Sequence, residues 1–172
     1  YADVLWFPTG GGKTEAYLGL IACALLYDRM RNKDGGVTAW LRFPLRMLSV
    51  QQLQRAVKVI YETEQERLEI WGADADHDPF SLGYFVGKSS TPNQLDNADW
   101  RGKWKISQLV AHEELRNQLR LVRTCPRCGE NRVEIEVDDQ NFRIHHVCQN
   151  CNLNLNIYVS DDEIYRYLPS VL

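Results

Sequence analysis

The sequence predicts an α/β fold in which a parallel sheet is interrupted late in the chain by a small antiparallel β insert. A glycine-rich loop at 10–12 separates an apolar run from a helix-forming run. Further on, short β-forming runs alternate with long helical patterns, which is typical of parallel sheets with crossover helices. Two Cys-x-x-Cys pairs then flank a stretch of alternating apolar and polar residues, which indicates the insert.

Composition limits the possible classes of protein. A length of 172 residues suits one domain, or one domain with a small insert, and 44 % apolar residues suffice for a packed core. The formal net charge of −3 gives no global basic field, so a nucleic acid must be bound by a local patch. We expect no membrane association and a cytoplasmic location, because no apolar stretch approaches the roughly 20 residues of a span and no signal peptide is present.

The glycine loop predicts a nucleotide site. It follows an apolar run at 4–7, expected to be the first strand, and precedes a helix expected from Lys13 to about Arg31. Glycines let the backbone curl and present several N–H groups to phosphate, and the helix start favours the same anion. Lys13 would reach the β- and γ-phosphates of ATP, and the Thr14 hydroxyl would bind Mg²⁺, so these two are the expected catalytic residues. The expected phosphate-binding residues are Thr9, Gly10, Gly11, Gly12, Lys13 and Thr14.

The next elements continue an α/β pattern. Residues 37–43 predict a second strand, parallel to the first because a helix connects the two. A helix is expected at 47–71, a third strand at 81–87 and a further helix at 104–122. Ligands of such sheets bind at the carboxyl ends of the strands, where the glycine loop and the turn at Pro44 would lie.

Two segments resemble superfamily 2 helicases and translocases. The first is Pro-Thr-Gly-x-Gly-Lys-Thr at 8–14, although Phe7 stands where the strict phosphate-loop pattern has glycine. The second is Pro-Leu-Arg-Met-Leu-Ser-Val-Gln at 44–51, with Leu45 where the family has threonine. The resemblance implies a RecA-like P-loop NTPase lobe that binds ATP, Mg²⁺ and DNA. It also implies nucleic-acid contacts by Pro44, Arg46, Gly87 and Ser89.

The paired cysteines predict a structural zinc site. Cys125 and Cys128 form one pair and Cys148 and Cys151 the other, a spacing typical of zinc ribbons. Four thiolates complete a tetrahedron and leave no open position for water, so we expect a structural role for the ion. Three antiparallel strands are expected around it, the last of them at 153–159.

A P-loop hydrolase also needs a carboxylate pair after a buried strand. Asp162 and Glu163 follow an apolar run, but asparagines alternate within that run, as in an exposed strand. We therefore interpret 161–163 as the acidic first turn of a short helix, followed by a return to the sheet at 169–172.

The whole pattern resembles the helicase subunit of the DISARM anti-phage defence system. The resemblance implies a partial RecA-like nucleotide-binding lobe at 1–123, a zinc-ribbon insert at 124–160 and a return to the lobe at 161–172. It also implies other subunits of a defence complex as partners. We expect this chain to be a truncated first lobe that hydrolyses little ATP alone, because the carboxylate box and second lobe would lie beyond it.

Two other functions fit the same motifs. The glycine loop also suits a P-loop phosphotransferase such as a small-molecule kinase, with the zinc ribbon as a lid. A non-catalytic zinc-ribbon adaptor that binds nucleic acid, with a degenerate nucleotide fold, is the other possibility.

Overall fold

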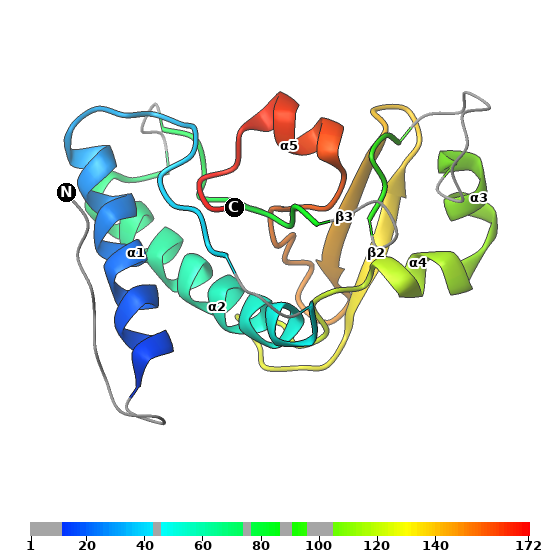
Figure 1. Cartoon of the computed structure of the whole chain (residues 1–172), viewed down its shortest axis with the longest axis horizontal. Coiled ribbons are helices and arrows are strands. Elements are labelled where there is room, and N and C mark those ends of the chain that lie inside the picture. The colour runs from blue at the N-terminus through cyan, green and yellow to red at the C-terminus, as the bar shows by residue number, and fades with distance from the viewer. Residues whose placement is uncertain (1–11, 43–45, 74–76, 87–90, 96–104) are drawn as a thin grey trace.

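The computed structural model describes residues 12–42, 46–73, 77–86, 91–95 and 105–172. Its helices and strands form a mixed α/β arrangement, in which α1 and α2 lie on one side of a small central sheet and the long β2–β3 hairpin lies on the other (Figure 1). Among the described residues, no helix is long and apolar enough to cross a membrane. The elements are α1 (Lys13–Met30), α2 (Arg46–Trp71), β1 (Leu82–Gly83), α3 (Ile106–Ala111), α4 (Glu113–Leu119), β2 (Val133–Asp138), β3 (Arg143–Cys148), β4 (Ile157–Tyr158) and α5 (Asp161–Tyr167).

The central sheet is parallel, as the sequence predicts. β1 pairs with β4, and single parallel bridges join Val171 to both Leu82 and Ala39. The spatial order is therefore Ala39, Val171, β1 and β4. Leu172 donates its backbone N–H to the Ala39 carbonyl at 2.9 Å, and Gly83 donates to the Val171 carbonyl at 2.8 Å. The return to the sheet predicted for 169–172 is confirmed, and this segment lies between two strands that precede it in the chain.

The two long helices agree with the predicted periodicity. α1 buries Leu18 and Leu25 against α2, and α2 buries Leu53, Val57 and Ile60 at spacings of three and four residues. Residues at these spacings lie on one helix face, so each helix presents an apolar stripe to the core. The predicted first strand at 4–7 lies outside the described residues.

Two arginines in these helices, Arg29 of α1 and Arg67 of α2, are buried, which was not predicted. Arg29 is only 2 % exposed, and its guanidinium lies 4.7 Å from the centre of the Phe80 ring. The same group donates a 2.8 Å hydrogen bond to the Asp78 carbonyl. Because the carbonyl and the ring both face the cation, this arginine joins the end of α1 to the segment that leads into β1.

The helix predicted at 104–122 is broken into two. His112 is extended, with φ −119° and ψ 107°, and separates α3 from α4. Arg116 donates hydrogen bonds of 2.8 Å to the carbonyls of Leu109 and Val110. These carbonyls belong to the last turn of α3 and lack helical partners, so the arginine compensates for the break.

The third strand of the predicted ribbon is also different from expectation. β2 and β3 pair antiparallel as predicted, but residues 153–159 contribute only one antiparallel bridge, between Asn154 and Val147. Asn156 has a left-handed backbone with φ 48°, which asparagine tolerates better than most residues. The chain is thereby redirected, and β4 joins the parallel sheet instead of the ribbon.

The short helix predicted after Ser160 is confirmed as α5. Ser160 is its N-cap, and the Ser160 and Glu163 side chains form a reciprocal capping box. Glu163 is completely buried and also accepts the backbone N–H of Ile144 on β3 at 3.3 Å. Asp162 pairs with Arg166 one turn later at 3.2 Å. The interpretation of these acids as a helix start is therefore supported by the geometry.

Gly83 allows α5 to lie against the sheet. α5 connects β4 to the segment at 169–172 and so crosses over β1, which lies between them. A Cβ atom at Gly83 would lie 2.7 Å from both Leu172 Cδ2 and Pro169 Cγ, and 3.2 Å from Ile164. Real Cβ atoms essentially never approach other atoms to 2.7 Å, so a side chain here would force Leu172 and Pro169 to shift, and the crossover favours glycine.

We predict that Gly83→Ala lowers the free energy of unfolding by about 1–3 kcal/mol, because the added methyl group overpacks this contact. Urea unfolding measures the change. Gly19→Ala is the matched control, since a Cβ there meets nothing within 4 Å and the position is in the middle of α1. The Gly19→Ala substitution should raise the free energy of unfolding by roughly 0.5–1 kcal/mol. Equal stability of the two variants would contradict the crossover contact.

The buried Glu163 also predicts a pH dependence. Burial raises the pKa of this carboxyl above its ordinary value of 4.5, although hydrogen bonds from Ser160 and Ile144 oppose the shift. Because the folded state favours the protonated form, its contribution to stability is lost as the pH rises from 4.5 through the raised pKa. Glu163→Gln should remove this loss, which is at most about 1.4 kcal/mol per pH unit. Denaturation between pH 4 and 8 tests it, with the exposed Glu66→Gln expected to retain the wild-type profile.

Candidate metal centre

The first cysteine pair lies on a tight turn between α4 and β2. The N–H of Cys125 donates to the Glu130 carbonyl at 2.9 Å, and the N–H of Gly129 donates to the Cys125 carbonyl at 3.0 Å. Gly129 has φ 74°, a left-handed conformation that glycine adopts without strain. The turn therefore carries the side chains of Cys125 and Cys128 on one short loop.

The second pair repeats the same hydrogen bonds at the end of β3. The N–H of Cys148 donates to the Leu153 carbonyl at 2.9 Å, and the N–H of Asn152 donates to the Cys148 carbonyl at 2.8 Å. Asn152 takes the left-handed position, with φ 55°, that glycine has in the first turn. Two Cys-x-x-Cys turns with one bonding pattern are typical of zinc knuckles, and we refer to 125–130 as the first knuckle and 148–153 as the second.

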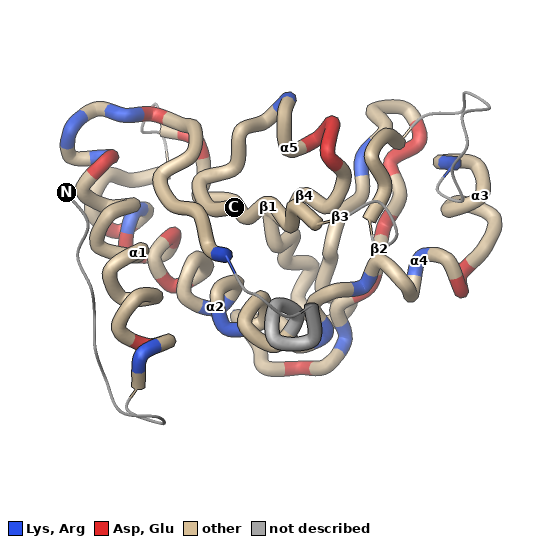
Figure 2. The backbone as a smooth tube through the Cα atoms, in the orientation of Figure 1, with Lys and Arg blue, Asp and Glu red and all other residues tan. Residues whose placement is uncertain are grey.

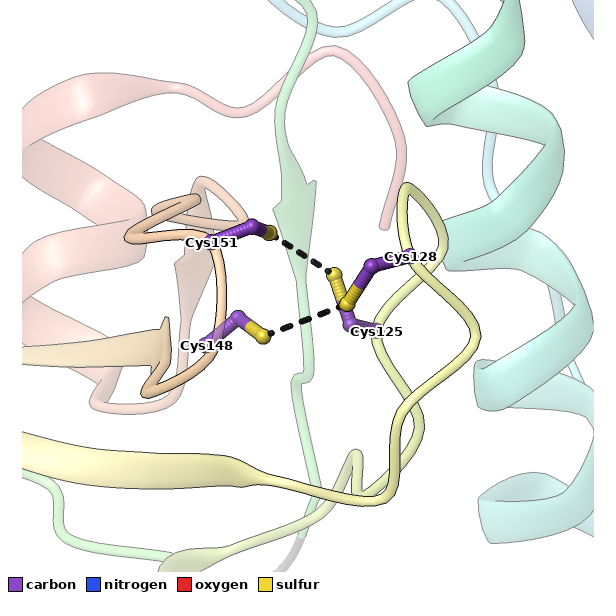
Figure 3. A group of neighbouring side chains, drawn as sticks. All are labelled: Cys125, Cys128, Cys148 and Cys151. Carbon is purple, nitrogen blue, oxygen red and sulfur yellow. Dashed lines mark hydrogen bonds between the residues drawn. The ribbon is translucent and has the colours of Figure 1, made fainter.

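The β2–β3 hairpin brings the knuckles together. Val133 at the start of β2 pairs with Cys148 at the end of β3, so the loops that flank the hairpin meet. The four cysteine side chains point toward one another across the gap between the knuckles (Figure 3). Their sulfur atoms all lie within 4.8 Å of one another, so the structure gathers the four residues that the sequence assigns to one metal.

The sulfur positions fit a tetrahedral zinc ion. Cys125 Sγ lies 3.6 Å from Cys151 Sγ, and Cys128 Sγ lies 3.7 Å from Cys148 Sγ. Four sulfurs at about 2.3 Å from one ion would be separated by about 3.8 Å, whereas a disulfide bond measures about 2.05 Å. All four cysteines are free of disulfides. The donor set is therefore compatible with zinc, which prefers four thiolates in this geometry.

The protein environment shifts the pKa values of Cys125 and Cys128 in opposite directions. Burial raises the pKa of Cys125 to about 12, because the thiolate is excluded from water. The backbone N–H of Glu130 stabilises the Cys128 thiolate and lowers its pKa to about 7, against a smaller effect of burial. A divalent cation would stabilise all four thiolates at neutral pH and release their protons. Without such a charge, the buried Cys125 remains a thiol.

Neither neighbouring histidine belongs to the sulfur cluster. His146 is completely buried, and its Nε2 donates to the Leu119 carbonyl at 3.1 Å. Its pKa is lowered to about 4, mainly by burial, so the ring is neutral. His145 accepts a 3.1 Å hydrogen bond from the Asn154 amide. Four sulfur ligands close the coordination sphere, so the arrangement suits a structural ion and leaves no position for a reacting water.

The predicted nucleotide site is described only at its end. Gly12 is the N-cap of α1, with a left-handed φ of 78°, and its carbonyl accepts the N–H of Ala16 at 3.1 Å. Lys13 opens the helix, and the Thr14 hydroxyl lies 3.0 Å from the Tyr17 hydroxyl. Thr9, Gly10 and Gly11 lie outside the described residues.

Most of the residues predicted to contact nucleic acid also lie outside the described part of the chain. Pro44, Gly87 and Ser89 lie outside the described residues. Arg46 is the first residue of α2, and only its backbone is described.

Sequence reasoning missed two residues beside the metal centre. Gln54 on α2 hydrogen-bonds to the backbone just before the first knuckle, and Tyr61 accepts a 3.2 Å hydrogen bond from Nε of Arg127 within it. Gln54 and Tyr61 are seven residues apart on one face of α2, and each is partly exposed beside the buried apolar residues of that helix. A glutamine in that position was the only signal of a polar partner.

The chain is similar to a known protein across nearly its whole length. It is 35 % identical to "DISARM protein DrmA" of Bacillus paralicheniformis over an alignment of 192 positions, which covers 99 % of this chain. The alignment covers 16 % of that relative, so the chain spans about one sixth of the relative's length. No protein-family model matches the chain.

We predict that the protein binds one zinc ion per chain and that Cys148→Ser reduces this to nearly none. Cys148 is completely buried, and a serine there removes one thiolate from the tetrahedron. Structural zinc contributes about 10–16 kcal/mol of apparent binding free energy in zinc-finger peptides, so the melting temperature should also fall. Elemental analysis and thermal melts measure both quantities.

The matched control for the zinc prediction is Cys23→Ser, because Cys23 is exposed on α1 and far from the knuckles in sequence. This variant should keep its zinc and its melting temperature. Full zinc content in Cys148→Ser, or iron in place of zinc, would contradict the assignment.

Proposed function

We propose that this chain is part of an ATP-driven DNA translocase or helicase that acts in anti-phage defence. The observation that carries the proposal is the 35 % identity to DISARM protein DrmA over 99 % of the chain. A similarity of this extent supports a DISARM-related protein, and a defence complex with other subunits is the expected setting. The ATP-driven activity is an inference from the sequence motifs together with the fold.

The start of α1 supports a phosphate site. Gly12 is left-handed and Lys13 begins a right-handed helix, an alternation of backbone conformation that is typical of anion-binding turns. The N–H groups of the first turn and the dipole of the 18-residue α1 add positive potential at the same end. In the proposal, Thr9, Gly10, Gly11 and Gly12 surround the phosphates of ATP.

The two residues after the glycines have separate proposed roles. Lys13 is exposed at the start of α1 and would neutralise the β- and γ-phosphates. Thr14 is in the first helical turn, and its hydroxyl would be one ligand of Mg²⁺. The metal would supply charge neutralisation of the phosphates when bound.

The parallel sheet supports a shared edge for the nucleic-acid segments. Pro44 and Arg46 follow the strand segment that contains Ala39, while Gly87 and Ser89 follow β1. Only the segment at Val171 separates these two strands, which places their carboxyl ends about 10 Å apart. Ligands of open parallel sheets bind beyond this edge, so DNA is proposed to contact both segments there.

Charge favours a limited contact with DNA. Basic and acidic residues are interspersed along the described backbone (Figure 2), so the described elements do not form one continuous basic stripe. Affinity for DNA would then depend on a few phosphate contacts, of which Arg46 is the proposed one. The proposed role of zinc is structural, since the cysteine cluster contains no open ligand position.

We predict that DNA stimulates ATP hydrolysis by the natural protein that contains this sequence, and that Lys13→Ala lowers the stimulated rate at least about 100-fold. Loss of one charge that stabilises the transition state typically has an effect of this size. A coupled ATPase assay with and without DNA measures it. Lys58→Ala, which removes an exposed lysine from α2, should leave the rate unchanged.

The competing functions give different results in the same protein. Transfer of phosphate to a small molecule without DNA would indicate a kinase. Calorimetry that detects no binding of ATP with Mg²⁺ would indicate a non-catalytic zinc-ribbon adaptor. Either result would exclude the translocase.

A further inference from the structure

The side chain of Gln54 joins α2 to the chain just before the first knuckle. Its Nε2 donates to the Thr124 carbonyl at 2.8 Å. Its Oε1 accepts the backbone N–H groups of Arg123 and Thr124 at 3.3 and 3.4 Å. One amide therefore satisfies two backbone donors and one backbone acceptor of the segment that leads directly into Cys125. A carboxylate or an apolar side chain could not make the same set of bonds.

A second contact lies two helical turns further along α2. Arg127, between the two cysteines of the first knuckle, donates from Nε to the Tyr61 hydroxyl at 3.2 Å. Its guanidinium carbon also lies 6.0 Å from the centre of the Tyr61 ring. Gln54 and Tyr61 are seven residues apart and so lie on one face of the helix. The first knuckle thus lies alongside α2, as Figure 3 also shows.

The second knuckle is attached to a different part of the molecule. The Leu153 carbonyl closes its turn, and β4 begins only four residues later and pairs with β1. Leu155, between them, packs against both the cysteine cluster and the main hydrophobic core. The two knuckles are therefore anchored to α2 and to the parallel sheet respectively, and the sulfur cluster is the point at which they meet.

Packing alone does not fill the space between these two anchors. A cavity of 230 Å³ lies between α2, the first knuckle and the segment at 153–156. Val57 and Tyr61 of α2 line it together with Pro126 and Asn154. The pocket opens to solvent, so apolar contact between α2 and the segment at 153–156 is incomplete here. A metal ion bonded to both knuckles would add a second link between these parts.

We propose that the metal centre controls the order of α2, and that Gln54 and Arg127 transmit metal occupancy to the middle of this helix. With a metal bound, the first knuckle is held to the second, and the Gln54 and Arg127 contacts hold the helix against the sheet. Without it, the hairpin still pairs Val133 with Cys148, but the sulfur atoms of the two knuckles keep only weak thiol contacts at 3.6 and 3.7 Å. The attachment of α2 through the first knuckle is then weaker. Gln54 is thus a positioning residue and not a metal ligand.

The coupling between metal occupancy and the order of α2 does not depend on the proposed function. An effect of this coupling on DNA binding does rest on the proposed function. α2 begins at Arg46, the residue proposed to contact DNA. Order imposed on the middle of the helix extends along its hydrogen bonds to this end. Metal occupancy would then also influence nucleic-acid binding.

Hydrogen exchange of the natural protein that contains this sequence tests the coupling without any assay of activity. Amides of α2 from Leu53 to Tyr61 are compared between the zinc-loaded protein and protein stripped with a chelator. We expect exchange in this segment to become roughly tenfold faster on stripping. In zinc-loaded Gln54→Ala, the zinc content should be unchanged and exchange of the same segment roughly fivefold faster, as expected for loss of its hydrogen bonds.

Gln51→Ala is the matched control, because Gln51 is an exposed glutamine one turn earlier in α2. It should leave exchange unchanged. If Gln54→Ala and Gln51→Ala behave alike, or if stripping removes zinc without altering exchange in α2, the coupling is overturned. If stripping unfolds the whole protein, the test is the comparison of exchange in α2 between zinc-loaded Gln54→Ala and zinc-loaded Gln51→Ala. Absence of DNA-stimulated ATPase activity would overturn the proposed function and leave this result standing.

Discussion

The convergence of four sulfur atoms on one point is the constraint on which the second half of the structure depends. Two knuckles, 125–130 and 148–153, have the same backbone hydrogen bonds and face each other across the end of the β2–β3 hairpin. A hairpin with six residues in each strand is only marginally stable in water. Thiolates gathered within 4.8 Å, two of them buried, would require a cation to offset their mutual repulsion.

The hairpin is not an isolated module, because its apolar side merges with the rest of the core. Ile135 of β2 and Ile144 of β3 belong to the same hydrophobic cluster as Leu25 of α1 and Val57 of α2. Glu163 of α5 adds a buried hydrogen bond to β3. The ribbon therefore contributes to the same folding unit as the parallel sheet, and the metal centre lies between the two.

The sequence predicted the elements whose cause is local. Apolar residues at helical spacing predicted α1 and α2, since each helix has to bury one stripe. The acidic turn after Ser160 predicted α5, because a capping box requires only residues that are three positions apart. The cysteine pairs predicted the ligands of the metal centre, as the spacing within each pair already directs two thiols to one ion. The boundaries predicted at 123 and 160, and the nucleotide and nucleic-acid roles, stay predictions.

What the sequence determined by itself is thus helices α1, α2 and α5, the parallel character of the sheet and the cysteine pairs, because periodicity, capping and knuckle spacing act over a few residues. Only the tertiary structure decided where 153–159 would pair, since the left-handed Asn156 redirects the chain from the hairpin to β1. It also decided that Gln54 would contact the segment just before the first knuckle, 69 positions away at Arg123. Such contacts depend on how whole elements pack. Local sequence patterns specify helices, turns and strands, but they do not specify which distant residue a side chain contacts.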